Sequence, residues 1–304
     1  MSERQPKGPA ERVHSATAHA KINLRLRVFR PDDQGYHSIE TLFLRTSLHD
    51  TVELELSSPG IELQVAGDPA VPDGPENLCW HAAERFFEAV GMEPAVRIAL
   101  SKSIPSGSGL GGGSADAAAV LRLLNHGLGN PLTDGQLLMV AGSLGSDVPF
   151  AALGVPMALG WERGRRLLPL PPPRTRPALL VVPDFGIGSG EAYGWLRVDR
   201  DSQAETPASD SVFSGSLPKP GKLSSWNELA GLAANDFEAP VFARYPELAE
   251  VRSRLLATGA EISRMTGSGS SVFAVYSDSQ TRDAAHTGAG WPPEWSVIPV
   301  ETPV

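Results

Sequence analysis

Alternation of apolar and polar residues predicts several strands in the first third of the chain. Over residues 22–28 apolar side chains occupy every second position, and the residues between them are polar. This pattern is typical of a half-buried strand, with Lys21 and Asn23 on the face away from the core. Residues 52–56 and 61–65 alternate in the same way and are separated by Ser-Ser-Pro-Gly. We therefore expect these two segments to pair as a hairpin.

Helical periodicity and capping signals predict helices farther along the chain. Apolar residues recur at every fourth position of the first expected helix, and a glycine follows it as a stop signal. Two other helices open on a capping-box pattern, Thr133 with Gln136 and Ser225 with Glu228. The helices expected are residues 78–90, Ser114 to about Leu128, one from Thr133 to Gly145, one opening at Ser225, and 245–258.

The order of these elements predicts an α+β protein with two domains. Further short strands are expected at 96–100, 178–182, 272–276 and 295–300. Because antiparallel-looking strands come first and mixed helices and strands follow, regular βαβ alternation is not favoured. The length of 304 residues also suggests about two domains. We expect a disordered tail over 1–13, domains over 14–160 and 161–304, and a mobile Ser-, Pro- and Asp-rich insertion near 198–222 in the second domain.

Composition excludes several classes of function. The formal net charge of −9 argues against nucleic acid as a partner, because phosphate neutralisation needs a basic surface. Cys79 is the only cysteine, so there is no disulfide framework, and a buried, inert thiol is expected. The polar N-terminus lacks the apolar segment of a signal peptide, and no run of 18 apolar residues occurs. We therefore expect no membrane association and a cytoplasmic location.

A glycine-rich segment carries the strongest chemical signal. Residues 105–114, Pro-Ser-Gly-Ser-Gly-Leu-Gly-Gly-Gly-Ser, contain five glycines within seven positions and precede the Ala-rich helix. Glycines allow close approach to a ligand, and the helix adds free backbone N–H groups and its dipole. We therefore favour a phosphate-binding loop over a merely flexible one. No Walker A sequence is present, and the match of Gly107, Gly109 and Gly112 to a dinucleotide fingerprint lacks the preceding strand that this motif needs.

Several motifs together resemble those of the GHMP kinases. They are Ala-Lys-Ile-Asn-Leu at 20–24, Gly-Tyr-His at 35–37, the loop at 105–115, Leu-Gly-Ser-Asp-Val-Pro-Phe at 144–150 and Thr-Gly-Ser-Gly at 266–269. The resemblance covers about residues 15–285. It implies a domain like that of ribosomal protein S5 packed on a ferredoxin-like domain, with the active site between them.

The resemblance also implies roles for individual residues. Asp147 and Lys21 match the catalytic pair. Residues matching the ATP site are Pro105, Ser106, Gly107, Ser108, Gly109, Leu110, Gly111, Gly112, Gly113, Ser114, Ala115, Asn77, Gly267, Ser268 and Gly269. Residues matching the substrate side are Asn23, Tyr36, His37 and Tyr193, and these imply a small-molecule substrate, cytidine diphosphate-linked methylerythritol, with His37 on the cytosine edge and Tyr193 stacked on the ring.

The residues alone leave simpler alternatives open for each of these roles. Pro149 suits a helix start, so Asp147 could be only an N-cap. Lys21 could be a solvated lysine, and His37 an ordinary surface or buried histidine. In the kinase interpretation, Asp147 accepts or orients the hydroxyl proton of the substrate, and Lys21 stabilises the transferred phosphoryl group.

ATP is the expected co-substrate, and Mg²⁺ is expected to arrive with it rather than at a dedicated protein site. The sequence contains neither His-Glu-x-x-His nor Gly-x-Ser-x-Gly, so zinc and serine hydrolases are not indicated. Two rival functions remain, another small-molecule kinase of the same family and a nucleotide-binding relative without catalysis. We expect a monomer or weak homodimer.

Overall fold

Two sheets form the framework of the molecule. The computed structural model describes residues 13–31, 37–56, 59–162, 164–202, 223–288 and 290–304. The first sheet has the order β3-β4-β2-β1-β8, and β5 pairs with both β2 and β6. Its strands are β1 (Val13–Pro31), β2 (His37–Glu55), β3 (Gly60–Ala66), β4 (Ala95–Ser101), β5 (Met157–Trp161), β6 (Arg166–Pro169) and β8 (Ala234–Asn235).

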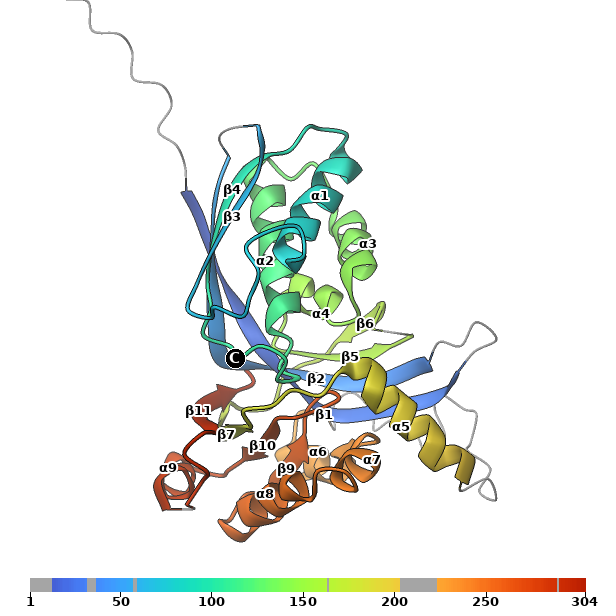
Figure 1. The fold of residues 1–304 in the computed structure, drawn as a ribbon, viewed down its shortest axis with the longest axis vertical. Coiled ribbons are helices and arrows are strands. Elements are labelled where there is room, and N and C mark those ends of the chain that lie inside the picture. Colours follow the sequence, from blue (N-terminus) through green and yellow to red (C-terminus); the bar gives the residue numbers. More distant parts are fainter. Residues whose placement is uncertain (1–12, 32–36, 57–58, 163, 203–222, 289) are drawn as a thin grey trace, which may run out of the picture.

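Helices cover one side of this sheet, as Figure 1 shows. They are α1 (Leu78–Val90), α2 (Gly112–Gly127), α3 (Asp134–Leu144) and α4 (Val148–Leu153). Helix α2 packs directly on β1 and β2 and contacts the three other helices. Its first residues follow the glycine-rich segment at once, so the packing of α2 on the sheet fixes the position of that segment.

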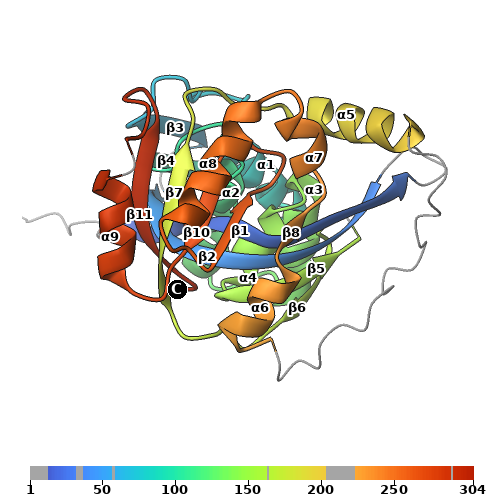
Figure 2. The same ribbon diagram turned by 90° about the horizontal axis from the view of Figure 1, so that it is seen from below.

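The second sheet is antiparallel, with the order β11-β7-β10-β9. Its strands are β7 (Arg176–Val182), β9 (Ile262–Met265), β10 (Val272–Val275) and β11 (Ser296–Thr302). The other helices are α5 (Ser189–Ser202), α6 (Trp226–Leu232), α7 (Glu238–Phe242), α8 (Pro246–Ala257) and α9 (Ser279–Gly288). Helices α8 and α9 pack on this sheet. Helix α5 contacts α7 and projects outward beyond it, as Figure 2 shows. The predicted α+β class is confirmed.

The predicted hairpin between residues 52–56 and 61–65 is wrong. Strand β4 lies between these two segments, antiparallel to β2 and parallel to β3. The chain passes from β3 through α1 to β4, and this crossover is what parallel neighbours require. Alternation identified both strands correctly but carries no information on which strand is the neighbour.

Helix boundaries follow the capping signals in most cases. Thr133 and Gln136 form the reciprocal capping box, and α1 ends at Gly91 in the left-handed conformation. Helix α2 begins two residues earlier than predicted. Ser225 occupies the N-cap of α6, but its side chain makes no capping hydrogen bond.

The predicted insertion near 198–222 overlaps the described chain only at its start. Residues 198–202 are the last residues of α5, and the mobility expected of the segment stays a prediction. The remainder of the insertion, Tyr36 and the predicted tail apart from Val13 lie outside the described residues. Val13 is the first residue of β1. The domain division at residue 160 stays a prediction, and β6 beyond it still belongs to the first sheet.

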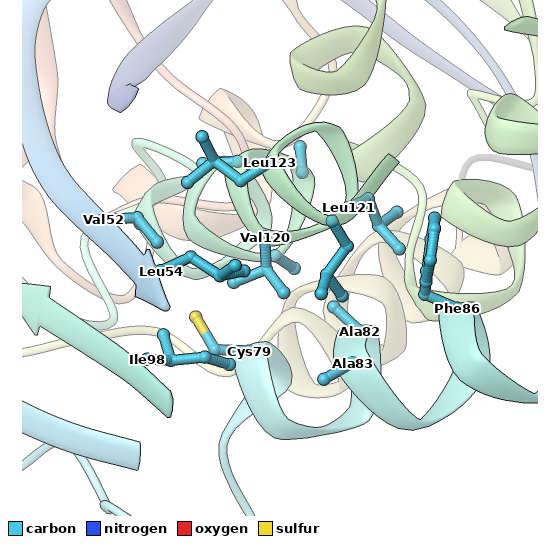
Figure 3. Close-up of a cluster of buried hydrophobic side chains, with 14 of the residues drawn as sticks. Val52, Leu54, Cys79, Ala82, Ala83, Phe86, Ile98, Val120, Leu121 and Leu123 are labelled. Carbon is cyan, nitrogen blue, oxygen red and sulfur yellow. The ribbon is translucent and has the colours of Figure 1, made fainter. Parts of the chain in front are cut away.

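The core between α1, α2 and the first sheet contains Cys79. Figure 3 shows the sulfur among side chains that include Val52, Leu54 and Ile98. Burial raises the pKa of the Cys79 thiol well above its usual value, so the thiolate that would make it reactive is disfavoured. The prediction of a buried, inert cysteine is confirmed. No helix in the described part of the chain is long and apolar enough to cross a membrane.

Candidate active site

Glycine-containing segments from the two halves of the chain pack backbone against backbone. Gly109 has φ +78°, and a Cβ there would lie 2.7 Å from the carbonyl oxygen of Thr266 and 2.8 Å from that of Gly269. A Cβ on Gly267 would in turn lie 3.0 Å from the Gly109 oxygen. Only residues without side chains fit this approach. The glycines therefore join the first loop to the late Thr-Gly-Ser-Gly segment.

A cavity of about 450 Å³ opens beside the first glycine loop. Its wall contains most of the loop, the start of α1 and the two catalytic candidates. The lining residues are Lys21, Val71, Pro72, Glu76, Asn77, Leu78, Lys102, Pro105, Ser106, Gly107, Ser108, Gly109, Gly111, Gly112, Gly113, Ser114, Asp116, Asp147, Ser189, Gly267 and Ser268. The backbone N–H groups at the start of α2 make this cavity suited to phosphate groups.

A second cavity of about 520 Å³ adjoins the first. The two share Lys21, Ser114, Asp147, Ser189, Gly267 and Ser268 in their walls. The second is further lined by Asn23, Leu26, His37, Ile39, Ser146, Tyr193 and Phe237. A phosphate donor in one cavity and an acceptor in the other would therefore meet at Lys21 and Asp147.

Lys21 and Asp147 form an ion pair at this junction. The Nζ of Lys21 lies 3.2 Å from Oδ2 of Asp147. It also donates to Oδ1 of Asn23 at 2.6 Å and to the carbonyl oxygen of Gly109 at 3.0 Å. Three acceptors match the three ammonium protons, so the position of Lys21 is fully determined. Its side chain is 7% exposed and that of Asp147 is 29% exposed.

Asn23 holds the arrangement around Lys21 together. Besides the Lys21 proton, its Oδ1 accepts the backbone N–H of Gly267 at 3.0 Å, and its Nδ2 donates to Thr41 at 2.7 Å. Asn23 is 2% exposed and Lys21 is 6% exposed as a whole residue, so the alternative of a solvated lysine is wrong. The polar face of β1 is buried because the late glycine segment covers it.

Asp147 occupies the N-cap position of α4, but its side chain makes no capping hydrogen bond. Pro149 stands in the first turn, as the sequence suggests. The helix start thus fixes the backbone of Asp147 and leaves its carboxylate free to contact Lys21 and both cavities. A purely capping role is therefore wrong.

Lys102, Asp50 and Asp116 form a buried charge cluster next to the glycine loop. Lys102 donates to Asp50 and, at 2.7 Å, to Asp116 of α2. Asp50 also accepts the backbone N–H of Ile104 at 2.8 Å. These bonds connect the end of β4, which precedes the glycine loop, to α2, which follows it. Oδ1 of Asp116 is buried and has no hydrogen-bond partner within the described residues.

Because of this cluster, we expect stability to fall as pH rises. Burial raises the pKa of Asp116 from 3.8 to about 7, although Lys102 opposes the shift. The folded chain therefore holds a proton between about pH 4 and 7 that the unfolded chain releases, so stability declines across this window. Asp116→Asn removes the titration and should raise the free energy of unfolding at pH 8 by about 1–2 kcal/mol relative to wild type, with little change near pH 4.

Urea unfolding of both proteins near pH 4 and at pH 8 measures this difference. Glu93→Gln, which changes an exposed acid, is the matched control and should follow the wild type. Equal pH dependence of Asp116→Asn and wild type would contradict the expectation.

Aromatic residues form one wall of the second cavity. The rings of His37 and Tyr193 stack with centroids 5.1 Å apart, and Phe237 meets Tyr193 edge-on at 4.9 Å. Nδ1 of His37 lies 2.7 Å from the carbonyl oxygen of Phe29, so it carries the proton and Nε2 is left as an acceptor. Burial, with a contribution from Asp147, raises the pKa of Tyr193. The wall therefore offers flat apolar rings and one acceptor.

The structure brings most of the predicted site residues together. Within the loop, Leu110 and Ala115 are exceptions, because their side chains are buried in the core and do not line the first cavity. Gly269 packs on Gly109 instead of lining a cavity. Asn77 lines the first cavity, but both ends of its amide are engaged by Cys79 and Pro72. Tyr36 lies outside the described residues.

Sequence reasoning missed several lining residues. Ser189 and Phe237 come from segments without a motif, and only the fold brings them to the cavities. Lys102 and Asp116 gave a weak signal, since each is a charged residue next to an apolar segment or within an Ala-rich one. No group of three or more His, Cys, Asp and Glu side chains in the described ranges is arranged to hold a metal ion.

The glycine packing predicts a sharp difference between two positions with left-handed backbone. A methyl group at Gly109 (φ +78°) collides with two carbonyl oxygens, whereas a methyl group at Gly129 (φ +80°), which lines neither of the two cavities, meets nothing within 4 Å. We expect Gly109→Ala to weaken ATP binding at least tenfold and Gly129→Ala to change it less than threefold, at about 1.4 kcal/mol per factor of ten. Titration with ATP measures both, and equal affinities would contradict the packing argument.

Comparisons with known proteins agree with this geometry. A model described as the GHMP kinases N terminal domain matches residues 77–155, and one described as GHMP kinases C terminal matches residues 215–288. A 4-diphosphocytidyl-2-C-methyl-D-erythritol kinase of Moorella thermoacetica is 41% identical over 273 residues, covering 88% of this chain and 92% of the relative. One of Geobacter sp. (strain M21) is 37% identical, covering 90% and 91%.

Solved structures show the same relationship. A crystal structure of 4-(cytidine 5'-diphospho)-2C-methyl-D-erythritol kinase superposes with a TM-score of 0.77 at 33% identity, covering 96% of this chain and all of the other. A homoserine kinase from Cytophaga hutchinsonii, at 18% identity and a TM-score of 0.67 over 99% of this chain and 98% of the other, shares the fold. The chain therefore belongs to the GHMP kinases and, within them, to the 4-diphosphocytidyl-2-C-methyl-D-erythritol kinases.

Proposed function

We propose that this chain transfers the γ-phosphoryl group of ATP to the 2-hydroxyl of 4-diphosphocytidyl-2-C-methyl-D-erythritol, a step of isoprenoid precursor biosynthesis by the methylerythritol phosphate route. The observation that carries the proposal is the junction of two cavities at Lys21 and Asp147. One cavity has the backbone donors that a triphosphate needs, and the other has an aromatic wall for a base. The names of the relatives supply the substrate.

In the proposed mechanism, Asp147 contacts the attacking hydroxyl. Its carboxylate borders both cavities and is not used in capping, so it is available to orient the hydroxyl and accept its proton. Phosphoryl transfer needs chiefly positioning and charge neutralisation. A fixed carboxylate beside the nucleophile supplies the first of these.

Lys21 supplies positive charge where the phosphoryl group passes. Its ammonium lies within hydrogen-bond distance of the Gly109 carbonyl of the glycine loop and of Asp147. It therefore borders both the donor and the acceptor. If one of its three hydrogen bonds is replaced, the ammonium can donate that hydrogen bond to the transferred phosphoryl group. A cation held in place before the reaction stabilises the developing charge without reorganisation.

Mg²⁺ belongs to the ATP that enters the first cavity. The hydroxyl of Ser114 lines both cavities, and such an oxygen donor would suit a cation that keeps most of its ligands as phosphate and water. Bound there, the ion would neutralise charge on the phosphate groups. A cytoplasmic location and a monomer or weak homodimer stay predictions.

The aromatic wall fits the cytosine end of the substrate. Nε2 of His37 is an acceptor, and the exocyclic amino group of cytosine is a donor at the edge of its ring. We propose that this pair forms while the ring stacks against Tyr193. Asn23, whose amide is engaged within the protein, shapes the site by holding Lys21.

His37→Ala tests this assignment. Loss of the acceptor and of the ring that supports Tyr193 should raise KM for the cytidylated alcohol roughly 10- to 100-fold, as expected for about 1.4–2.8 kcal/mol of lost binding. The kcat value and KM for ATP should change little. CMP and CDP should compete with the alcohol in the wild type and lose that competition in the variant. An unchanged KM would show that His37 does not contact the substrate. Absence of competition by CMP and CDP in the wild type would instead indicate a kinase for another alcohol, such as mevalonate or homoserine.

A further inference from the structure

The turn that joins β5 to β6 packs against the segment that carries Asp147. Gly164 in this turn is buried, with φ +73°. A Cβ at Gly164 would lie 2.1 Å from the carbonyl oxygen of Ser146 and 3.0 Å from its carbonyl carbon. The backbone of the turn and the peptide that enters Asp147 are therefore in direct contact, and no side chain fits between them.

The same turn also reaches the helix that precedes Asp147. A Cβ on Gly142 of α3 would lie 3.8 Å from Cγ of Arg165, so the stem of Arg165 lies against the last turn of α3. The segment between α3 and α4, which contains Ser146 and Asp147, is thus supported at two points by one turn.

Backbone pairing and a hydrogen bond within the turn fix its conformation. Trp161 and Arg166 are paired at the ends of β5 and β6, and the N–H of Arg165 donates to the carbonyl oxygen of Glu162 at 3.2 Å. Strand β5 is in turn paired with β2 in the first sheet. The contact at Gly164 therefore connects Asp147 to the sheet that also holds Lys21.

The position of the Asp147 carboxylate depends on contacts outside α4, because no hydrogen bond to α4 fixes this side chain. Its carboxylate makes no capping bond, and Lys21 holds it from one side only. We propose that Gly164 is a positioning residue for the phosphoryl transfer, because its backbone fixes the Ser146 carbonyl and thereby sets the distance from Asp147 to Lys21 and to the acceptor hydroxyl. The inference rests on the proposed role of Asp147.

Gly164→Ala tests this positioning role, with Gly129→Ala as its matched control. Gly129 has φ +80° and nothing within 4 Å of an added Cβ, so both substitutions carry the strain of a positive φ and only the first adds a collision. We expect Gly164→Ala to lower kcat at least tenfold with KM for ATP unchanged. Gly129→Ala, which adds the strain without the collision, should lower Tm by less and keep the wild-type kcat. Equal kcat values for the two variants would overturn the inference.

A double variant separates positioning of Asp147 from general damage. If Gly164 acts through Asp147, adding Gly164→Ala to Asp147→Asn should lower kcat no further, because the group being positioned is already lost. A further tenfold fall would overturn the inference. Turnover by the wild type in the same assay tests the proposed function separately, so failure of that function is distinguishable from failure of the positioning role.

Arg165→Ala keeps the inference testable if Gly164→Ala does not fold. This variant removes the support on α3 without adding atoms, and we expect kcat to fall about threefold at a wild-type Tm. Arg85→Ala, which truncates an exposed arginine on α1, is its control and should have wild-type kcat. Equal kcat for these two variants, alongside a Gly164→Ala chain that does not fold, would overturn the proposal.

Discussion

Asp147→Asn should lower kcat by about 10²–10⁴-fold, the range typical of a lost proton acceptor, while KM for ATP and for the alcohol changes little. The amide has the size of the carboxylate but cannot accept the hydroxyl proton. Because the Asp147 side chain makes no capping bond and the amide oxygen of asparagine can still accept a hydrogen bond from Lys21, the variant should keep nearly the wild-type Tm. An equal fall in kcat and kcat/KM is the signature of an interaction made in the transition state.

Steady-state kinetics with both substrates measures this effect, and Asp134→Asn is the matched control. Asp134 lies in the first turn of α3 and lines neither of the two cavities, so its variant should turn over like the wild type. A large rise in KM at unchanged kcat would instead assign Asp147 to substrate binding.

Lys21→Met should lower kcat by roughly 10²–10³-fold, which is the usual cost of one preorganised electrostatic contact. It should also destabilise the fold, unlike the Asp147 variant. The methionine leaves the Gly109 carbonyl and Oδ1 of Asn23 without the ammonium that both accept from. Loss of such bonds in a buried site costs about 1–3 kcal/mol of unfolding free energy.

The Lys21 prediction is checked by kinetics and urea unfolding together. Arg85→Met, which removes an exposed cation on α1, controls for loss of positive charge and should leave both measurements near wild type. Since Lys21 and Asp147 are in contact, the double variant should lose less activity than the two single losses multiplied. Full multiplicativity would mean that the two residues act independently, contrary to the ion pair.

The residues expected to bind phosphate and to carry out catalysis could be predicted from the sequence, because each of them lies in a short local motif. The glycine loop, the Lys-Ile-Asn strand and the segment around Asp147 each carry their signal within a few residues, and the structure brings them to one junction. The α+β class followed in the same way from element order. The same periodicity could not determine strand partners, so β4 between β2 and β3 was not foreseen.

The supporting residues could not be predicted because they depend on contacts distant in sequence. Alternation placed Lys21 and Asn23 on an outward face, and only the late glycine segment, 243 residues beyond Asn23, buries them. Gly164 in the turn after β5 and Asp50 within β2 have no motif of their own. Their effects on the site arise through a single backbone contact and a shared lysine.

The most direct test of the account is ADP release from Mg·ATP by the wild-type chain with four samples side by side. These contain 4-diphosphocytidyl-2-C-methyl-D-erythritol, mevalonate, homoserine or no acceptor. The account predicts turnover with the cytidylated alcohol alone, and its loss in Asp147→Asn. Turnover confined to another alcohol, or none at all from folded protein that still binds ATP, would contradict it.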